Sequence, residues 1–403
     1  MKYNGWTEAT LGELTEYVAR GITPKYSESN GLIVLNQKCI RDYKVNLELS
    51  RIHDINKKNV SEEKRLKKYD VLINSTGIGT AGRVAQWDRS IDATCDSHIT
   101  IVRPDADKID ERYFGYAVKA QQALIETFAE GSTGQTEMNK QRLCEEIVIK
   151  YPQSKEDQTK IAEMLCNIDE KIQINTTINE NLEQQAQAIF KSWFVDFEPF
   201  NNERPSNWIT SSLGSVCTCE LGGTPSRNKP EYWNGGNIPW INSGEVNLFR
   251  ITKPSEMITE LGLLKSSTKF LPEKTIVIAI TGATLGQISL LEIASCANQS
   301  VVGVKPNEHM PYEFIYPFIK ENIDELLLHQ TGGAQQHINK QNVENLDILV
   351  PDNETMTEYI QTVSGIYGLI SNNCFENEHL VNLRDSLLPK LMSGEIDVFE
   401  IDL

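Results

Sequence analysis

The sequence predicts an α+β protein with two homologous mixed α/β domains, separated by two long helices that pack as an antiparallel coiled coil with pseudo-twofold symmetry. Three observations support this fold class. The chain repeats its motifs at an offset of about 200 residues, each half carries short β-branched segments beside glycine-rich turns, and each half ends in a long segment with helical apolar spacing. At 403 residues the chain is long enough for two domains with separate cores.

Five motifs occur twice in the same order. Trp6 with Leu11-Gly12 returns as Trp208 with Leu213-Gly214, and a Gly-x-Thr-Pro turn at 21–24 returns at 222–225. The other repeated pairs are the loops 79–84 and 283–288, the segments 138–141 and 338–341 around Asn-Lys-Gln, and the apolar strands before Pro152 and Pro351. Unrelated segments would not keep this order, so the pattern indicates duplication of a whole domain. The period is too long for a solenoid repeat.

Short β-branched segments bounded by glycine, proline, asparagine or aspartate predict strands in both halves. These segments are 32–35, 70–74, 98–102 and 147–149 in the first half, and 276–280, 300–304 and 346–350 in the second. Before the last strand of each half, residues 111–130 and 312–329 have helical spacing of their apolar side chains. Each half therefore predicts a mixed α/β domain.

After each domain, apolar residues recur at steps of three and four, which is typical of coiled coils. The first stripe continues after a phase shift at Ile178, and the second includes Cys374 and Leu383. Helices of about 40 residues would extend about 60 Å. The candidates for contact with the partner helix are Ile161, Leu165, Ile168, Ile172, Leu182, Ile360, Val363, Tyr367, Ile370 and Leu387. The alternative is that each helix lies separately on its own domain.

The predicted boundaries are a first globular domain at 1–152, a central helical spacer at 153–199, a second globular domain at 200–351 and a C-terminal helical region at 352–403. The net charge of −17 is unevenly distributed. Residues 1–150 hold 22 basic and 22 acidic side chains, whereas 151–199 hold 4 and 9, and 351–403 hold 2 and 10. The acidity is concentrated in the helical segments, so the globular domains can still carry basic faces.

No catalytic or metal-binding constellation is visible. The six histidines form no HxH or HExxH pair, and phosphate-loop, nucleophile-elbow and amino-methyltransferase motifs are absent. Residues 77–82 fit GxGxxG, but residues 83–88 then alternate like a strand instead of starting a helix that could bind a pyrophosphate. Cys217-Thr-Cys219 lacks a second ligand pair. We therefore expect no catalytic residue, no metal and no cofactor bound by this chain.

Targeting segments are also not apparent. No apolar run approaches the roughly 18 residues needed to span a bilayer. The N-terminal residues lack the charged-then-apolar layout of a signal peptide. We expect a cytoplasmic protein.

Polar side chains at the predicted turns could contact nucleic acid, because amides, hydroxyls and guanidinium groups pair with base edges and phosphates. The candidates are Asn36, Gln37, Lys38, Ser75, Thr76, Arg83 and Lys140 in the first half, and Asn242, Ser243, Thr281, Thr284, Gln287 and Lys340 in the second. Taken singly, each also fits a turn or cap role. Asn139 and Asn339 in particular could cap a short helix.

The duplicated Trp-x₄-Leu-Gly, Gly-x-Thr-Pro, glycine-loop and Thr-Gly…Asn-Lys-Gln motifs, each followed by a long helix, resemble the specificity (S) subunits of type I restriction-modification systems. The resemblance covers essentially the whole chain. It implies two target-recognition domains that each read one half of an asymmetric bipartite sequence in double-stranded DNA. It also implies that the helices bind two methyltransferase subunits.

In this family the methyltransferase subunits carry S-adenosylmethionine and methylate adenine, and the complex recruits restriction subunits with motor and nuclease activity. The resemblance therefore implies that the S chain itself is not an enzyme. Acidic helices fit this role because they need not contact DNA. Two other classes stay open: a tandem protein-binding adaptor without a nucleic-acid partner, and part of a fused methyltransferase.

Overall fold

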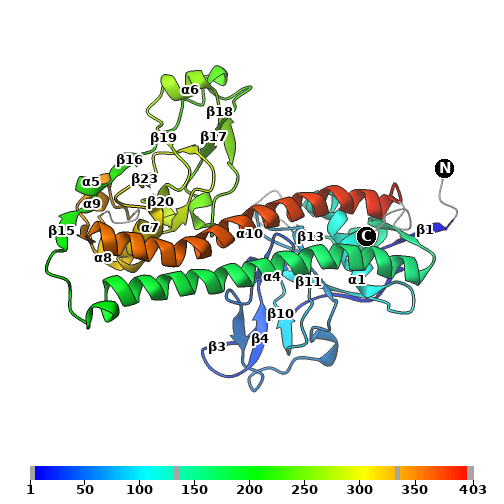
Figure 1. Cartoon of the computed structure of the whole chain (residues 1–403). Coiled ribbons are helices and arrows are strands. Elements are labelled where there is room, and N and C mark those ends of the chain that lie inside the picture. The colour runs from blue at the N-terminus through cyan, green and yellow to red at the C-terminus, as the bar shows by residue number, and fades with distance from the viewer. Residues whose placement is uncertain (1–4, 131–136, 332–335, 397–403) are drawn as a thin grey trace. The chain divides into compact units, whose positions relative to one another are not determined.

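A computed structural model describes residues 5–130, 137–331 and 336–396. The Thr133-Gly134 dipeptide and Gly332, which belong to the repeated Thr-Gly motif, lie outside this range. The chain forms two compact units (Figure 1). The first unit comprises residues 1–170 and 381–403, and the second comprises 171–380, so each unit takes a segment of both long helices.

In the first unit, two four-stranded sheets and a two-stranded pair carry the fold. The central sheet is antiparallel, with the order β2 (Thr15–Arg20), β11 (Ile99–Pro104), β8 (Val71–Asn74) and β9 (Val84–Gln86). The outer sheet has the order β10 (Ala93–Cys95), β4 (Leu32–Leu35), β7 (Arg51–His53) and β3 (Tyr26–Ser27). The third pair joins β1 (Trp6–Thr10) to β14 (Val148–Pro152).

The second unit has corresponding sheets. Its central sheet has the order β16 (Thr218–Leu221), β23 (Val301–Lys305), β20 (Ile276–Ala279) and β21 (Ile288–Leu290). Its outer sheet has the order β19 (Phe270–Leu271), β22 (Ser295–Ala297), β17 (Ile238–Ile241) and β18 (Glu256–Ile258). The third pair joins β15 (Ile209–Ser212) to β24 (Asp347–Val350). Among the described strands, a parallel pairing falls at the same place in both units, β4 with β10 and β17 with β22. The prediction of two homologous mixed α/β domains is confirmed.

Short elements complete the described chain. They are β5 (Ile40–Arg41), β6 (Lys44–Val45), β12 (Ala129–Glu130), β13 (Glu137–Met138), α5 (Leu213–Val216), α6 (Glu260–Leu264), and the 3₁₀ turns η1 (Gln37–Cys39), η2 (Glu62–Lys64), η3 (Glu198–Phe200), η4 (Pro230–Tyr232), η5 (Glu245–Asn247) and η6 (Gly282–Thr284).

The central sheet of each unit is buried on both faces. In β20, Ile276 and Ile278 lie in the core shared with the helices, whereas Val277 and Ala279 lie in the core shared with the outer sheet. The same alternation occurs in β8, where Val71 and Ile73 face one core and Leu72 the other. A strand covered on both sides is apolar throughout, which explains why these segments could be recognised from the sequence.

The repeated Gly-x-Thr-Pro turn has a steric cause. A Cβ atom at Gly21 would lie 2.1 Å from the carbonyl oxygen of Cys95, and one at Gly222 would lie 2.1 Å from that of Asn298. Both glycines therefore allow the chain that leaves β2 or β16 to pass close to the end of β10 or β22. Their amides and those of the next residues bond to carbonyls there, including Ile22 N to Cys95 O and Gly223 N to Ala297 O.

The helices inside the domains differ from prediction in one respect. Segments 111–130 and 312–329 each predict one helix, but the first forms α1 (Glu111–Ala120) and α2 (Gln122–Glu126), and the second α7 (Tyr312–Glu321) and α8 (Ile323–Leu328). Gln121 and Asn322 adopt non-helical dihedrals at the break. The bend directs Ile125 and Leu326 into the core, where both are fully buried.

The helix-cap prediction for the repeated Asn-Lys-Gln motif is confirmed. The side chain of Asn139 accepts hydrogen bonds from backbone amides of α3 (Lys140–Glu146), and that of Asn339 does the same for α9 (Lys340–Glu344).

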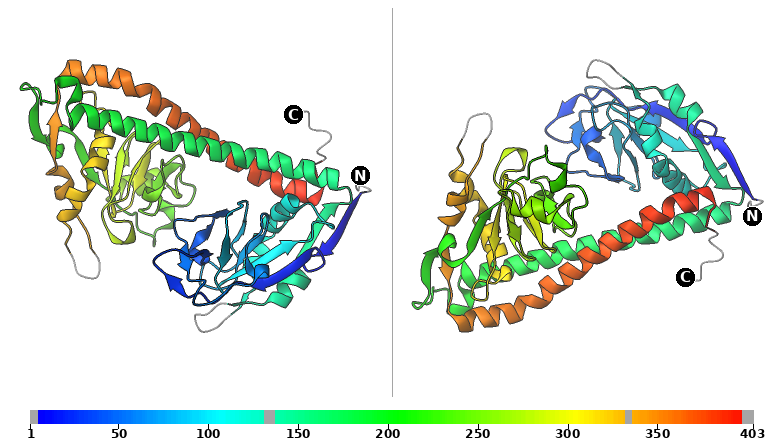
Figure 2. Two further views of the ribbon diagram at one scale, coloured as in Figure 1. Left: turned by 90° about the horizontal axis from the view of Figure 1, so that it is seen from below. Right: turned by 90° about the horizontal axis from the view of Figure 1, so that it is seen from above.

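The two long helices have the predicted length. Helix α4 (Lys155–Phe194) has 40 residues and α10 (Asn353–Ser393) has 41. Within each unit the two helix segments run side by side in opposite directions (Figure 2). Each segment also packs on the globular part of its unit, but the two helices contact each other, so the alternative of two separate helices is wrong. The first core includes Ile161 and Leu165 of α4 with Leu391 of α10, and the second includes Phe190 of α4 with Tyr359 of α10.

All of the residues predicted to contact the partner helix are buried or partly buried. Ile161, Leu165, Ile172, Val363, Tyr367 and Ile370 are buried, and Ile168, Leu182, Ile360 and Leu387 are partly buried. The apolar stripe is not continuous, however. Ile178 and Leu383 were expected inside it and are 39% and 38% exposed, because asparagines and Arg384 occupy the inward positions instead. No helix within the described residues is long and apolar enough to cross a membrane.

Candidate nucleic-acid interface

A concave surface in the first unit contains three of the predicted DNA-contact residues. It has a volume of about 330 Å³ and lies where β4 and β10 end and β7 begins. Because β4 and β10 are parallel, the residues after their carboxyl ends meet at one sheet edge. The lining residues are Tyr26, Asn36, Gln37, Lys38, Leu49, Arg51, Asp96 and His98.

Asn36 has a structural role at this edge. Its side-chain oxygen accepts a hydrogen bond from the Lys38 amide, and its side-chain amide donates to the Leu49 carbonyl at 2.7 Å. The backbone turn it stabilises leaves Gln37 partly exposed and Lys38 exposed. These two side chains are therefore better placed than Asn36 to contact a ligand at the edge.

Arg51 and Tyr26 were not found from the sequence. The Arg51 guanidinium lies 4.7 Å from the centroid of the Tyr26 ring, and both side chains are exposed. Stacking of this kind fixes the guanidinium plane and leaves its N–H groups available for paired hydrogen bonds. The pKa of the neighbouring Asp96 carboxyl is raised, because the effect of burial outweighs the opposing effects of His98 and the Arg51 charge. The three-residue strand β7, which Arg51 begins, gave no detectable period in the sequence.

A second concave surface, of about 380 Å³, surrounds the glycine-rich loop between β8 and β9. It is lined by Gly77, Ile78, Gly79, Ala81, Arg83, Glu126 and Ala129. Gly77, Gly79 and Gly82 have positive φ angles, so the loop needs glycine there. Arg83 donates to the Gly79 carbonyl at 2.8 Å and thereby holds the loop closed. The loop connects two strands, as predicted.

Thr76 bonds to two residues of the first concave surface. Its hydroxyl lies 2.6 Å from His98 Nδ1 and donates to the Gln37 side-chain oxygen at 3.4 Å. The neighbouring candidate, Ser75, is fully buried and its hydroxyl pairs with that of Thr100. Ser75 therefore supports the sheet instead of facing a ligand. His98 is the further residue that the structure adds to this edge.

In the second unit, equivalent strand positions carry different chemistry. Arg227 follows the Gly-x-Thr-Pro turn as Tyr26 does, and Glu256 begins β18 as Arg51 begins β7. Arg227 donates to both Glu256 oxygens at 2.5 and 2.6 Å, and its guanidinium lies 3.6 Å from the Trp233 ring centroid. The same edge thus presents an ion pair on an aromatic ring where the first unit presents a stacked arginine.

The candidates of the second unit are more involved in local turns. Asn242 accepts from the Gly244 amide and bonds to the Glu245 carboxylate, and Ser243 is partly exposed beside it. The Thr284 hydroxyl donates to the Thr281 carbonyl within the loop before β21, and Gln287 is exposed. These side chains lie on two separate loops, after β17 and after β20.

The two repeated lysines differ. Lys340 pairs with Glu344 one helical turn later at 3.0 Å, which accounts for it as a surface ion pair of α9. Lys140 begins α3 and is exposed.

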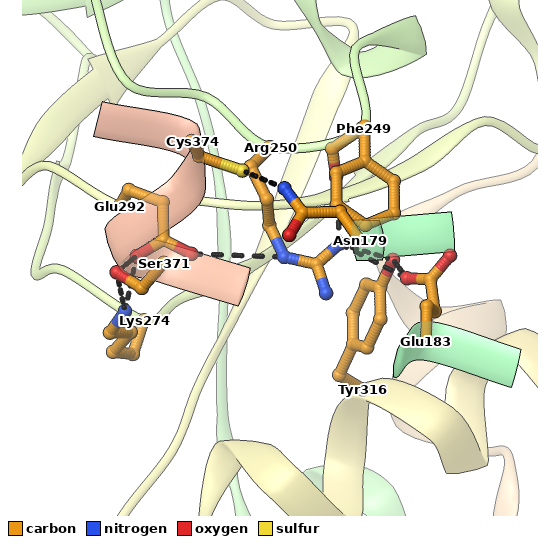
Figure 3. A network of polar contacts seen from close by, with 9 residues as sticks. All are labelled: Asn179, Glu183, Phe249, Arg250, Lys274, Glu292, Tyr316, Ser371 and Cys374. Carbon is orange, nitrogen blue, oxygen red and sulfur yellow. Dashed lines mark hydrogen bonds and ion pairs between the residues drawn. The ribbon is translucent and has the colours of Figure 1, made fainter. Parts of the chain in front are cut away.

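A buried polar network attaches the second domain to both helices (Figure 3). The Arg250 side chain is 1% exposed and donates to Glu183 of α4 at 3.1 Å and to the Tyr316 hydroxyl at 2.9 Å. Glu292 accepts from Ser371 of α10 at 2.6 Å and also pairs with Lys274. Burial would raise the pKa of Glu183, but Arg250 and Lys320 more than offset that effect.

The first unit has a smaller network of the same chemistry. The Tyr116 hydroxyl donates to Asp169 of α4 at 2.8 Å, and Arg384 of α10 donates to the same carboxylate at 2.7 Å. Tyr116 and Tyr316 are equivalent, since each follows a buried phenylalanine by two residues in α1 or α7. A tyrosine, a carboxylate and an arginine therefore join domain to helix in each unit.

The buried thiols show no sign of a shared ligand. Burial raises the pKa of Cys217 and of Cys219 to about 12, so both are protonated at neutral pH. Across residues 5–130, 137–331 and 336–396, no group of three or more histidine, cysteine, aspartate or glutamate side chains is arranged to hold a metal ion.

Comparison with known proteins identifies the family. The profile described as "Type I restriction modification DNA specificity domain" matches residues 3–184 and 205–370. The chain belongs to this family. Among curated type I specificity proteins, it is 24% identical to the HindI specificity subunit of Haemophilus influenzae, over 97% of this chain and 99% of that protein. It is 28% identical to the MjaIX specificity subunit of Methanocaldococcus jannaschii, over 72% of this chain and 69% of that protein.

A solved specificity-subunit structure has the same fold. The type I S subunit from M. genitalium matches with a TM-score of 0.58 at 18% identity, covering 97% of each chain. The resemblance expected from the repeated motifs is thus confirmed, together with the fold class.

Proposed function

We propose that this chain is the DNA specificity subunit of a type I restriction-modification complex and that each globular repeat reads one half of an asymmetric bipartite target. One observation carries the proposal beyond family membership. Two units with corresponding sheets present different polar groups at equivalent strand positions: Arg51 stacked on Tyr26 in one, and Arg227 paired with Glu256 in the other. A shared scaffold with unlike edge chemistry suits the reading of two unlike half-sites.

The chemistry of the first edge favours a guanine. A planar arginine side chain donates two hydrogen bonds to guanine O6 and N7, the commonest base-specific contact in the major groove. Gln37 and His98 lie on the same concave surface and can contact neighbouring bases. Lys38 and Lys140 are exposed lysines suited to phosphate contacts, which position a protein without reading sequence.

The remaining assignments follow from the family. The target-recognition domains are 1–152 and 200–351, and the helical regions 153–199 and 352–403 bind two methyltransferase subunits in the cytoplasm. Those subunits hold S-adenosylmethionine and transfer the methyl group, and restriction subunits join the complex; this chain itself does not catalyse. In the second unit, the helices offer exposed apolar side chains for such docking, at Ile174, Leu369 and Phe375.

The test compares three variants in the complex with its methyltransferase subunits, scored by adenine methylation of a randomised duplex library. Wild-type complex should methylate a split motif. Arg51→Met should relax one position of one half-site, a loss of about 1–3 kcal/mol in discrimination, whereas Lys38→Met should weaken all sequences alike. Arg41→Met is the control, because Arg41 is highly exposed and lies outside the concave surface.

Three outcomes would count against the proposal. Methylation without any bipartite motif would refute the specificity role. Binding that does not weaken as salt rises would favour the protein-adaptor alternative, since phosphate contacts release counterions. Methyl transfer by the purified chain alone would point to the fused-enzyme alternative.

A further inference from the structure

Four asparagines meet in the middle of the helix pair, in the second unit. The Asn175 side-chain amide donates to Asn377 at 3.0 Å, and that of Asn373 donates to Asn179 at 2.9 Å. Asn175, Asn179 and Asn373 are at least nine-tenths buried. Polar amides therefore occupy inward positions where the periodic pattern would place aliphatic side chains.

These contacts are symmetric with respect to the duplication. At an offset of 198 residues, Asn175 corresponds to Asn373 and Asn179 to Asn377. The two donors, Asn175 and Asn373, are therefore equivalent in the repeat, and so are the two acceptors, Asn377 and Asn179.

The remaining amide groups of the acceptors obey the same relation. Asn377 donates to Thr176 Oγ1 and Asn179 donates to Cys374 Sγ, both at 3.4 Å, and Thr176 and Cys374 are again 198 residues apart. Figure 3 includes the Asn179–Cys374 contact. These four hydrogen bonds are isologous, like those of a twofold dimer, although both helices belong to one chain. A further bond, from Asn175 to Glu376 at 2.7 Å, has no counterpart, because Ile178 stands at the equivalent position.

Apolar side chains at such positions tolerate a shift of one heptad, but amides do not. A shift of seven residues would place Asn175 against Ile370 and Asn179 against Ile366, where their amides have no partner. One buried amide without a partner disfavours the shifted register by roughly 5- to 150-fold. A single buried asparagine already fixes register in coiled coils at a cost in stability.

We propose that Asn175, Asn179, Asn373 and Asn377 are a register key that fixes the spacer length of the bipartite target. This inference rests on the proposed function. A one-heptad shift displaces one helix along the other by about 10 Å at 1.5 Å per residue. At about 3.4 Å per base pair, that displacement corresponds to roughly three base pairs of spacer.

The first test replaces all four asparagines by leucine and measures methylation of duplexes whose spacers differ in length. The wild-type complex should accept one length. The measured quantity is the methylation rate on a target whose spacer is changed by about three base pairs, divided by the rate on the original target. This ratio should be at least tenfold higher for the N175L/N179L/N373L/N377L complex than for wild type. The matched control is N181L/N372L, because these two asparagines are exposed on the same helices; it should keep the wild-type selectivity.

The second test reads the register without DNA. Lys171 and Glu376 form an ion pair at 3.3 Å, so a short thiol-specific cross-linker should join K171C to E376C in the native register. K171C/L369C reports a shift of one heptad. In full-length protein, the second pair should cross-link at least tenfold more in the four-leucine background than with the asparagines present.

The leucine variant is expected to melt no lower than wild type, because apolar replacement of buried polar groups is often neutral or stabilising. A folded variant with unchanged spacer selectivity and only native cross-links would overturn the register key and show that the two domain cores fix the register. If four leucines prevent folding, N179L/N373L decides by the same two measurements. A wild-type complex without a bipartite target would instead refute the proposed function, and the cross-linking result would be unaffected.

Discussion

Removal of the Arg250 charge should lower the free energy of unfolding of the second unit much more than removal of an exposed arginine from the same unit. Arg250 and Glu292 each have side chains that are 1% exposed, and Glu183 is 16% exposed. Arg250→Met keeps most of the volume but leaves both carboxylates without their central cation. Loss of one partner from a buried ion pair costs about 3–5 kcal/mol, because the other charge stays desolvated.

The expected value lies near the lower limit of that range. Glu292 keeps Lys274 and Ser371, and Glu183 keeps Lys320 at 3.0 Å and the Tyr316 hydroxyl. We therefore expect a loss of about 3 kcal/mol in the free energy of unfolding of the second unit. Arg227→Met is the matched control, because its ion pair with Glu256 is about half exposed. Exposed pairs contribute about 1 kcal/mol or less.

Hydrogen exchange measured by mass spectrometry can assign the loss to one unit. Peptides from β20 and α7 should exchange through opening that is about 100-fold more frequent in Arg250→Met, whereas peptides from β8 and β11 of the first unit act as an internal reference. Equal effects of Arg250→Met and Arg227→Met would refute the reasoning. A similar acceleration in the first-unit peptides would also do so, because it would mean that the network is not local to its unit.

Three further predictions concern single positions. Hydrogen bonds from the Thr355 amide and the Trp208 indole lower the pKa of Asp352, the N-cap of α10, from 3.8 to about 2. The stability that the ionised carboxylate contributes is therefore present above pH 3.8 and is lost as the pH falls towards 2. Asp352→Ala should cost about 1 kcal/mol at pH 7 and should weaken the dependence of the melting temperature on pH in the acid range. Gly21→Ala and Gly222→Ala should each destabilise by more than about 2 kcal/mol in urea denaturation, because a Cβ would overlap a backbone carbonyl; an unchanged midpoint would contradict the steric account. Gly365→Ala should instead raise the free energy of unfolding by about 1 kcal/mol, and with it the melting temperature, because this position in α10 is exposed and a Cβ atom there meets no neighbour.

The sequence could predict those parts of the fold whose backbone needs a particular residue or period. Gly21 and Gly222 repeat because no Cβ fits beside a strand end, and Asn139 and Asn339 repeat because each caps a short helix. Strands such as β20 were recognisable because both of their faces are buried. Each of these signals can be seen in a short stretch of sequence, even where, as for Gly21 and β20, a tertiary contact causes it.

The candidate site was only partly predictable, because its residues come together across strands that are too short to show a period. Gln37 and Lys38 were found from their turn, but Arg51 belongs to a three-residue strand and Tyr26 to a two-residue one. Ser75 has the residue type and position of a ligand contact, yet its hydroxyl is buried against Thr100. Side-chain direction, which decides between these cases, is set by sheet pairing rather than by local sequence.

The contacts that attach the domains to the helices are only partly repeated between the two units. Tyr116 and Tyr316 occupy equivalent places, but their carboxylate partners do not: an offset of 198 residues relates Asp169 to Tyr367, whereas the second unit uses Glu183. Both carboxylates therefore belong to α4. The buried tyrosine hydroxyl requires an acceptor in each unit, and the chain supplies it from whichever helix position is near. The framework is repeated, while the polar contacts that complete it have diverged, as they have at the two sheet edges that we propose read DNA.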